Sequence, residues 1–362
     1  MDNEWMVYVC GEHCCSSRNK SLKKDTFNLI GGALGYYRDE IDSVLTQAKD
    51  KLSSTFVNVY DRVIDILAMS QQPDVTVFQI QQYYREIIDL LQDPDKQTQY
   101  VQSVEEDITT AQDAAIAATL TFYPSVIIAN MGKKPARVMK PTIRTPGKDE
   151  FVTGISFGGT AIANIISDTT TDVFTRITTK FREYITNPDL NREDFIDSVN
   201  DAIDTIDSYA ENISTTEVEA TTRRVVKRFN ALNQPLVKSY RRVAVIDNKT
   251  CVGCLALHGK LYALADEFES HPRCRCMLVP VTMTWMEYAS VQGGAVPNYM
   301  SLDQILGMMP REILADILGP GRLALYDAGL PLERMIYIEQ TAEYGHLIRI
   351  TPLSVLREQG IP

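Results

Sequence analysis

Residues 247–276 read DNKTCVGCLALHGKLYALADEFESHPRCRC. This stretch holds a Cys-x-x-Cys pair, then sixteen residues, then a His-x-x-Cys-x-Cys group. Its five candidate metal ligands are Cys251, Cys254, His271, Cys274 and Cys276. Each two-residue spacing forms a turn that presents both donors on one side, and Gly253 permits the tight reversal of the first turn. Two such turns brought together offer the tetrahedral nitrogen and sulfur donors that suit Zn²⁺.

A tetrahedral site takes four donors, so one of the five candidates is not a ligand. Cys251, Cys254 and His271 fill three positions. Spacing leaves Cys274 and Cys276 open, because the first completes a two-residue-spaced turn and the second suits presentation by an alternating strand. The alternative without a metal is a set of four reduced structural thiols.

Two further groups of possible ligands are weaker. His258 follows Cys254 by four residues and is predicted to lie on the surface. A second metal site near the N-terminus would have to use Cys10, His13, Cys14 and Cys15. Adjacent cysteines are awkward ligands for one ion, so we interpret that segment as one with incidental thiols.

The ligand set favours a structural zinc, one per chain, over a catalytic one. A catalytic zinc keeps an open position beside a general base, whereas five candidates, four of them thiols, favour a closed site. Glu267 and Glu269 are close in sequence, but no His-Glu-x-x-His or deaminase pattern accompanies them. We therefore predict no enzyme; the alternative is a metal-dependent nuclease or toxin-like enzyme.

Bulk composition narrows the class of protein. The chain has 362 residues, 44% of them hydrophobic, which predicts a packed core. A net charge of −11 argues against a protein that coats nucleic acid. No apolar run reaches 18 residues, and the acidic start does not resemble a signal peptide, so neither a membrane span nor secretion is expected. In a reducing cytoplasm the cysteines are predicted to be ligands or thiols.

Apolar residues recur at helical spacing over much of the chain. The predicted helical segments are 26–70 (one helix or two in series), 76–92, 99–121, 160–186, 193–211 and 215–239. Pro124 is expected to end the third. One face of the last segment carries the basic run Arg223, Arg224, Lys227 and Arg228, predicted to be solvated. Short β-like pieces follow residue 243, then short helices at 301–307 and 310–318, broken at 319–321.

Residues 132–148 change in character. They hold three prolines, six Lys or Arg and no acid, so a helix is not expected. One interpretation is a solvated loop; the other is an arm that contacts DNA or an acidic partner. Its basic residues include Lys133, Lys134, Arg137, Lys140 and Arg144.

These patterns predict a mainly α protein. Long N-terminal helices and a helical middle region precede a small zinc-bound α+β module and a short mixed C-terminal tail. The predicted regions are 1–131 (N-terminal helices), 132–148 (basic Pro-rich linker or arm), 149–242 (helical), 243–285 (zinc-binding module) and 286–362 (C-terminal extension).

From about Ser214 to Cys276 the sequence resembles the phage head-morphogenesis proteins, also called Mu F-like minor head proteins. The matching elements are Thr216–Glu217, the strand from Lys238-Ser239-Tyr240 to Ala244, the turn Asp247–Cys254, then Gly259 and the group His271–Cys276. Two departures are Tyr240, where the family commonly has Trp, and Thr215, where it often has Arg before the Thr-Glu pair.

The resemblance implies a minor capsid protein of the virion. Such a protein associates with the portal and the inner head surface during head assembly in the host cytoplasm, in multiple copies per particle. It would lie in the head interior or at the portal vertex and act in genome packaging or delivery. In such a particle the basic residues of the arm would contact packaged DNA or an acidic surface of the portal. A third hypothesis is a DNA-binding module that uses the arm and the basic run of residues 223–228.

Overall fold

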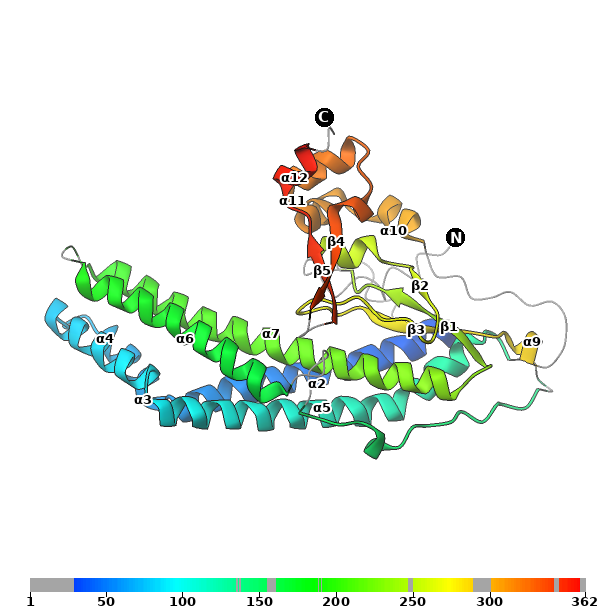
Figure 1. The fold of residues 1–362 in the computed structure, drawn as a ribbon, viewed down its shortest axis with the longest axis horizontal. Helices are drawn as coiled ribbons and strands as arrows, with labels where there is room; N and C mark the ends of the chain where they lie inside the picture. Colours follow the sequence, from blue (N-terminus) through cyan, green and yellow to red (C-terminus); the bar gives the residue numbers. More distant parts are fainter. Residues whose placement is uncertain are drawn as a thin grey trace. The chain divides into compact units, whose positions relative to one another are not determined.

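The computed structural model describes residues 29–134, 136, 138–154, 161–187, 189, 191–246, 250–288, 301–341 and 345–358 (Figure 1). The N-terminal cysteine group and Arg137 lie outside the described residues. The prediction of a mainly helical protein with a small sheet-containing C-terminal region is confirmed, and helix makes up 66% of the chain. Within the described ranges, no helix is long and apolar enough to cross a membrane.

In the part of the chain that the structure describes, six α-helices precede the first strand. They are α2 (Leu29–Val59), α3 (Asp61–Ser70), α4 (Val77–Leu91), α5 (Pro94–Asn130), α6 (Ile162–Thr186) and α7 (Arg192–Leu232). The first predicted segment is therefore two helices in series that meet at Tyr60. A capping box starts α4, because the Thr76 hydroxyl accepts the Gln79 amide and the Gln79 side chain accepts the Thr76 amide.

Pro124 does not end its helix, so the predicted stop at residue 121 is wrong. α5 continues through Pro124 to Asn130. A proline inside a helix costs about 3 kcal/mol. Tyr123, Val126 and Ile127 are fully buried along this turn, and their burial outweighs the lost backbone hydrogen bond.

The two helices predicted over 193–211 and 215–239 are one helix, α7. Side chains in the polar stretch between them bond within the helix: the Thr216 hydroxyl donates to the Asn212 carbonyl at 2.6 Å. The predicted C-terminal end was too late. α7 ends at Leu232, where the Asn233 side-chain amide donates to the Phe229 carbonyl, and the following residues form a strand.

Packing divides the chain into two units, each built from separate segments. Unit 2 comprises Ser43–Ala114 and Val152–Val218. Its core contains buried apolar residues of α3, α4 and parts of the longer helices. Within it, an aromatic cluster of Phe56, Tyr60, Tyr100 and Phe174 joins the end of α2 to α5 and α6. Helical periodicity explains this core directly, because the same apolar positions predicted the helices.

Unit 1 comprises Met1–Asp42, Ala115–Phe151 and Glu219–Pro362. Its three-stranded antiparallel sheet has the order β2-β1-β3 (Figure 1). The strands are β1 (Val237–Val243), β2 (Leu261–Tyr262) and β3 (Met277–Thr282). A second sheet is the hairpin of β4 (Ile336–Thr341) and β5 (Gly345–Ile350).

Short helices complete unit 1. They are α8 (Val252–Ala256), α9 (Trp285–Tyr288), α10 (Leu302–Met308), α11 (Arg311–Asp327) and α12 (Leu353–Glu358), with 3-10 turns η3 (Lys148–Glu150) and η4 (Leu332–Met335). The predicted break after residue 318 is a kink within α11, where Gly319 has a φ of 69°. Glycine tolerates this left-handed conformation, and the helix resumes at Pro320.

The basic segment before η3 has no helix or strand among its described residues, as predicted. The Asn233 side chain binds this segment at Arg144. Its Nδ2 donates to the Arg144 carbonyl, and its Oδ1 accepts the backbone N–H of Arg144, both at 2.8 Å. The Lys134 ammonium lies 5.9 Å from the centre of the Trp285 ring. Lys133 and Lys140 are exposed.

Candidate metal centre

The first pair of cysteines is placed by the start of α8. Cys251 precedes this helix with an extended backbone, and its Sγ accepts the backbone N–H of Cys254 at 3.2 Å. The Cys251 sulfur thus caps the first turn of the helix, as the side-chain oxygen of Ser or Asp does in most helices. The short helix therefore brings the two sulfurs of the Cys-x-x-Cys turn to one side.

The second turn comes just before β3. The Cys274 amide donates to the His271 carbonyl at 3.1 Å, and Arg273 has a left-handed φ of 62°. His271 Nδ1 lies 2.6 Å from the Pro272 carbonyl, which can only accept a hydrogen bond. The proton is thereby assigned to Nδ1, so the Nε2 lone pair faces the thiols and is free to bind a metal.

The donor atoms converge from both turns. His271 Nε2 lies 3.1 Å from Cys251 Sγ and 3.0 Å from Cys254 Sγ. Cys254 Sγ lies 3.8 Å from Cys274 Sγ. Tetrahedral zinc with ordinary bond lengths separates two sulfurs by about 3.8 Å and a sulfur from a nitrogen by about 3.6 Å. The sulfur–sulfur separation matches this geometry, and the two nitrogen–sulfur separations are about half an ångström shorter. Cys274 is joined to Cys251 and His271 through Cys254, so a single shell around these four donors requires the two turns to draw together.

All five predicted ligands belong to this cluster. Cys251, Cys254 and His271 form one group whose donor atoms lie within 4.8 Å of one another; Cys254, Cys274 and Cys276 form another. The four cysteines are free thiols, and only Cys251 is not fully buried. The arrangement could bind a metal ion, and Cys254 belongs to both groups.

The electrostatics of the first group favour a thiolate. The hydrogen bond from Cys254, with help from His271, lowers the pKa of Cys251 to about 4, although burial opposes this. Burial alone would lower the pKa of His271, but the Cys274 thiolate and the hydrogen bond to Cys251 raise it to about 10. Without a metal the ring therefore carries a proton on Nε2 as well, and a metal ion that binds at Nε2 must displace that proton. Thiolates are the form of cysteine that binds metals.

His258 is not on the surface, so that prediction is wrong. It is buried, and its Nδ1 accepts the backbone N–H of Ala244 at 3.1 Å. A buried polar ring must find a hydrogen-bond partner, and here it satisfies the amide that follows β1. This contact joins segments 14 residues apart in sequence.

One residue of the predicted solvated basic run is instead buried behind the second turn. Arg223 Nη1 donates to the Cys274 carbonyl at 2.8 Å, and its Nη2 donates to the Ser270 hydroxyl at 3.2 Å. The exposed Arg228 conforms to the prediction and pairs with Glu150. Glu219, Thr222, Arg223 and Val226 follow one another at helical spacing and form one face of α7.

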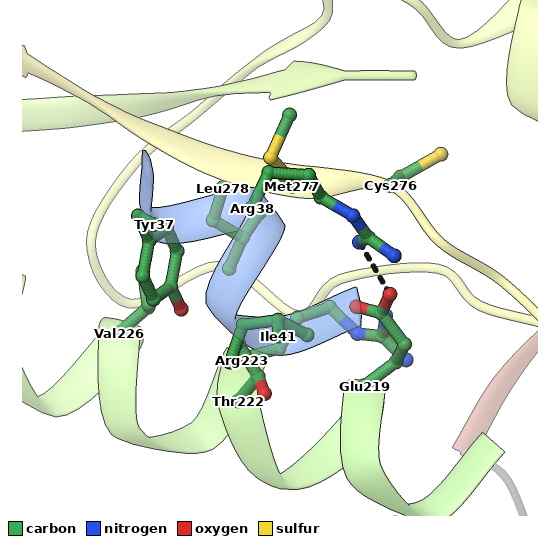
Figure 2. A pocket seen from close by; sticks show the side chains of 10 residues that line it. All are labelled: Tyr37, Arg38, Ile41, Glu219, Thr222, Arg223, Val226, Cys276, Met277 and Leu278. Carbon is green, nitrogen blue, oxygen red and sulfur yellow. Dashed lines mark hydrogen bonds and ion pairs between the residues drawn. The ribbon is translucent and has the colours of Figure 1, made fainter. Parts of the chain in front are cut away.

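This face of α7 meets α2 and β3 around a cavity of about 10 Å³ (Figure 2). The Arg38 guanidinium, from α2, binds the Glu219 carboxylate and donates to the Arg275 carbonyl at 3.3 Å. Burial raises the pKa of Glu219 against the effect of both arginines. Arg38 thus binds the Arg275 carbonyl and Arg223 binds the Cys274 carbonyl, so these two buried arginines fix the backbone of the turn that begins at His271.

Gly253, between the first two cysteines, packs against the C-terminal hairpin. A Cβ at this position would lie 2.5 Å from Cγ2 of Ile348 in β5. We expect Gly253→Ala to lower the free energy of unfolding by about 1–3 kcal/mol, because the backbone of α8 and the hairpin must separate. Denaturant unfolding measures this. The matched control is Gly307→Ala in α10, where nothing lies within 4 Å and helix propensity favours alanine. Equal stability of both variants would contradict this packing.

Sequence reasoning missed Arg38, Glu219 and Arg242, and it assigned Arg223 to solvent. Arg242, in β1, lies beside the cluster, with its Nη2 3.5 Å from Cys274 Sγ. Each looks like an ordinary helix or strand charge in the sequence. Their role depends on which helices and strands pack around the cluster, and the sequence alone does not give this packing.

No protein-family model, no curated protein and no solved structure matches the chain.

Proposed function

We propose that Cys251, Cys254, His271 and Cys274 hold one structural zinc ion. The observation that carries this proposal is the unbroken chain of contacts from Cys251 through His271 and Cys254 to Cys274, with donor separations of 3.0–3.8 Å. Three thiolates and one imidazole complete a tetrahedral shell, which leaves no position for a substrate or a reactive water. Cys276 is then a buried thiol next to the site.

The surrounding fold supports a structural role. β2 has two residues and α8 has five, so these pieces have little core of their own. Small modules of this kind obtain their folding free energy from the metal. The ligand turns are also tied to α2 and α7 by Arg38 and Arg223, so an ordered zinc site would fix both helices to the sheet.

Matched serine variants separate the two possible fourth ligands. Cys276→Ser should keep one zinc per chain, whereas Cys274→Ser should lose it or bind it at least 100-fold more weakly, because one thiolate of the shell is removed. Elemental analysis and chelator competition measure both. The reverse result would place Cys276 in the shell.

We further propose that the chain is a minor head protein that acts in phage head assembly, in association with the portal or the inner head surface. The cysteine–histidine cluster lies in the C-terminal part of the segment that resembles this family, which runs from about Ser214 to Cys276. A fixed zinc module offers a partner a preformed surface, which spares the complex the cost of ordering it. The long helices supply further contact area.

Mass spectrometry of purified virions and empty proheads tests the assembly role. We expect the chain in portal-containing particles and expect Cys254→Ser to reduce its incorporation, since the unordered module presents no fixed interface. A chain absent from both particles would contradict the proposal. Turnover of nucleic acid that disappears in the same variant would favour the enzyme alternative.

The basic arm gives a separate prediction. Replacing Lys133 and Lys140, which are exposed, by glutamine should leave the free energy of unfolding within about 0.5 kcal/mol of the wild type. Binding of the purified chain to DNA should weaken and depend less on salt, because two phosphate contacts are lost. Filter binding across a salt series measures this, and an unchanged salt dependence would exclude the two lysines from DNA contact.

A further inference from the structure

Arg242, in β1, is a fully buried cation beside the cysteine cluster. Its Nη2 lies 3.6 Å from Cys254 Sγ and 3.5 Å from Cys274 Sγ. Its Nη1 donates to the backbone carbonyl of Glu269 at 2.8 Å, and its guanidinium lies 4.5 Å from the centre of the Phe268 ring. The guanidinium is thus held in place by groups on three sides.

Among the described residues, no carboxylate forms an ion pair with Arg242. The nearby Glu269 carboxylate binds Lys260 and Tyr262 instead. A buried charge is costly unless an opposite charge lies beside it, and a carbonyl and an aromatic face supply only partial compensation. Neutral thiols would leave this cation uncompensated, whereas thiolates compensate it.

Charge balance distinguishes the possible ligand sets. Zn²⁺ with three thiolates and a neutral imidazole carries one net negative charge, which the single guanidinium cancels. Zn²⁺ with four thiolates carries two negative charges, and one would remain buried without a partner. The three-thiolate set therefore matches the one buried cation that touches the sulfurs.

We infer that Arg242 is the counter-cation of the metal centre, a positioning residue that stabilises a shell of three thiolates and one imidazole. The inference rests on the proposed zinc site. Its hydrogen bonds to Cys254 and Cys274 hold one sulfur from each turn, and its bond to the Glu269 carbonyl anchors the segment that leads to His271. Arg242 thus acts on both charge and geometry of the ligands.

The test compares three variants of the full chain: Arg242→Met, Arg242→Lys and the control Lys238→Met. The control removes one positive charge from an exposed position on the same strand. Chelator competition gives the zinc affinity. Cobalt substitution gives a second readout, because the thiolate-to-cobalt charge-transfer absorption grows with the number of bound thiolates.

We expect Arg242→Met to weaken zinc binding about 10–100-fold, as for other outer-shell partners of metal ligands. Its charge-transfer absorption should fall from that of three thiolates toward that of two. Arg242→Lys keeps the charge but cannot contact both sulfurs and the Glu269 carbonyl with one fork, so it should weaken zinc binding less than Arg242→Met does, by at most about tenfold. Lys238→Met should have the zinc affinity of the wild type. A purely structural role of Arg242 would change stability but not the charge-transfer absorption.

Two outcomes would overturn the inference. One is an Arg242→Met protein with wild-type zinc affinity and absorption. The other, which remains available if Arg242→Met does not fold, is a loss of more than tenfold in Arg242→Lys. A wild-type chain that binds no metal would instead overturn the zinc site itself, so the two failures are distinguishable.

Discussion

Replacing Cys254 by serine should remove the bound metal and unfold the turns and sheet of residues 243–285, while unit 2 keeps its helices. Cys254 is the ligand that belongs to both groups of converging donors, so no other single change disrupts both. Metal binding and local folding share one free energy, on the order of 10 kcal/mol in small zinc modules. Zinc content and hydrogen exchange followed by segment measure the two effects together.

Cys276→Ser is the matched control for this prediction, because it removes a buried cysteine of the same cluster that lies outside the proposed shell. It should keep both the metal and the exchange protection of β1 and β3. Loss of protection in the unit 2 core, around Tyr60 and Phe174, in the Cys254→Ser protein would contradict the separation of the two units. Zinc retained at one equivalent would contradict the ligand assignment.

The second large effect concerns the buried ion pair of Arg38 and Glu219. Arg38→Met should lower the free energy of unfolding by about 3–5 kcal/mol, because the Glu219 carboxylate, 1% exposed, loses its main partner. The Arg275 carbonyl would lose a donor as well, so the ligand turn should loosen. Urea unfolding of the zinc-loaded chain measures the change.

The control for this prediction is Arg62→Met, which breaks the exposed pair of Arg62 and Glu86. Exposed pairs contribute at most about 1 kcal/mol, so this variant should be nearly as stable as the wild type. Equal losses in both variants would show that burial does not govern the Arg38 pair. A second check is Glu219→Gln, which keeps the size and hydrogen-bonding atoms and should cost less than Arg38→Met.

The cluster of candidate metal ligands could be predicted from the sequence because the signal is local. A two-residue spacing fixes the geometry of each turn, and the structure brings Cys251, Cys254, His271, Cys274 and Cys276 together. The helices were predictable for the same reason, since apolar periodicity is written into each segment. Which of Cys274 and Cys276 completes the shell was not local information, because it depends on how the two turns meet.

The errors arose where distant contacts decide the outcome. Pro124 stays in α5 because Tyr123 and the next turn are buried against other elements of unit 1. Arg223 looked like a solvated charge, yet it bonds to Cys274, 51 residues away. His258 satisfies an amide 14 residues earlier. Local sequence patterns do not show which distant groups a side chain contacts, so the burial of these residues could not be predicted without the fold.

The most direct test of the zinc centre is X-ray absorption spectroscopy of the purified, metal-replete, reduced chain, with elemental analysis of the same sample. We predict one zinc per chain, bound by three sulfurs at about 2.3 Å and one nitrogen at about 2.0–2.1 Å. A chain with no zinc, or with a zinc shell made only of oxygen and nitrogen, would contradict the central claim.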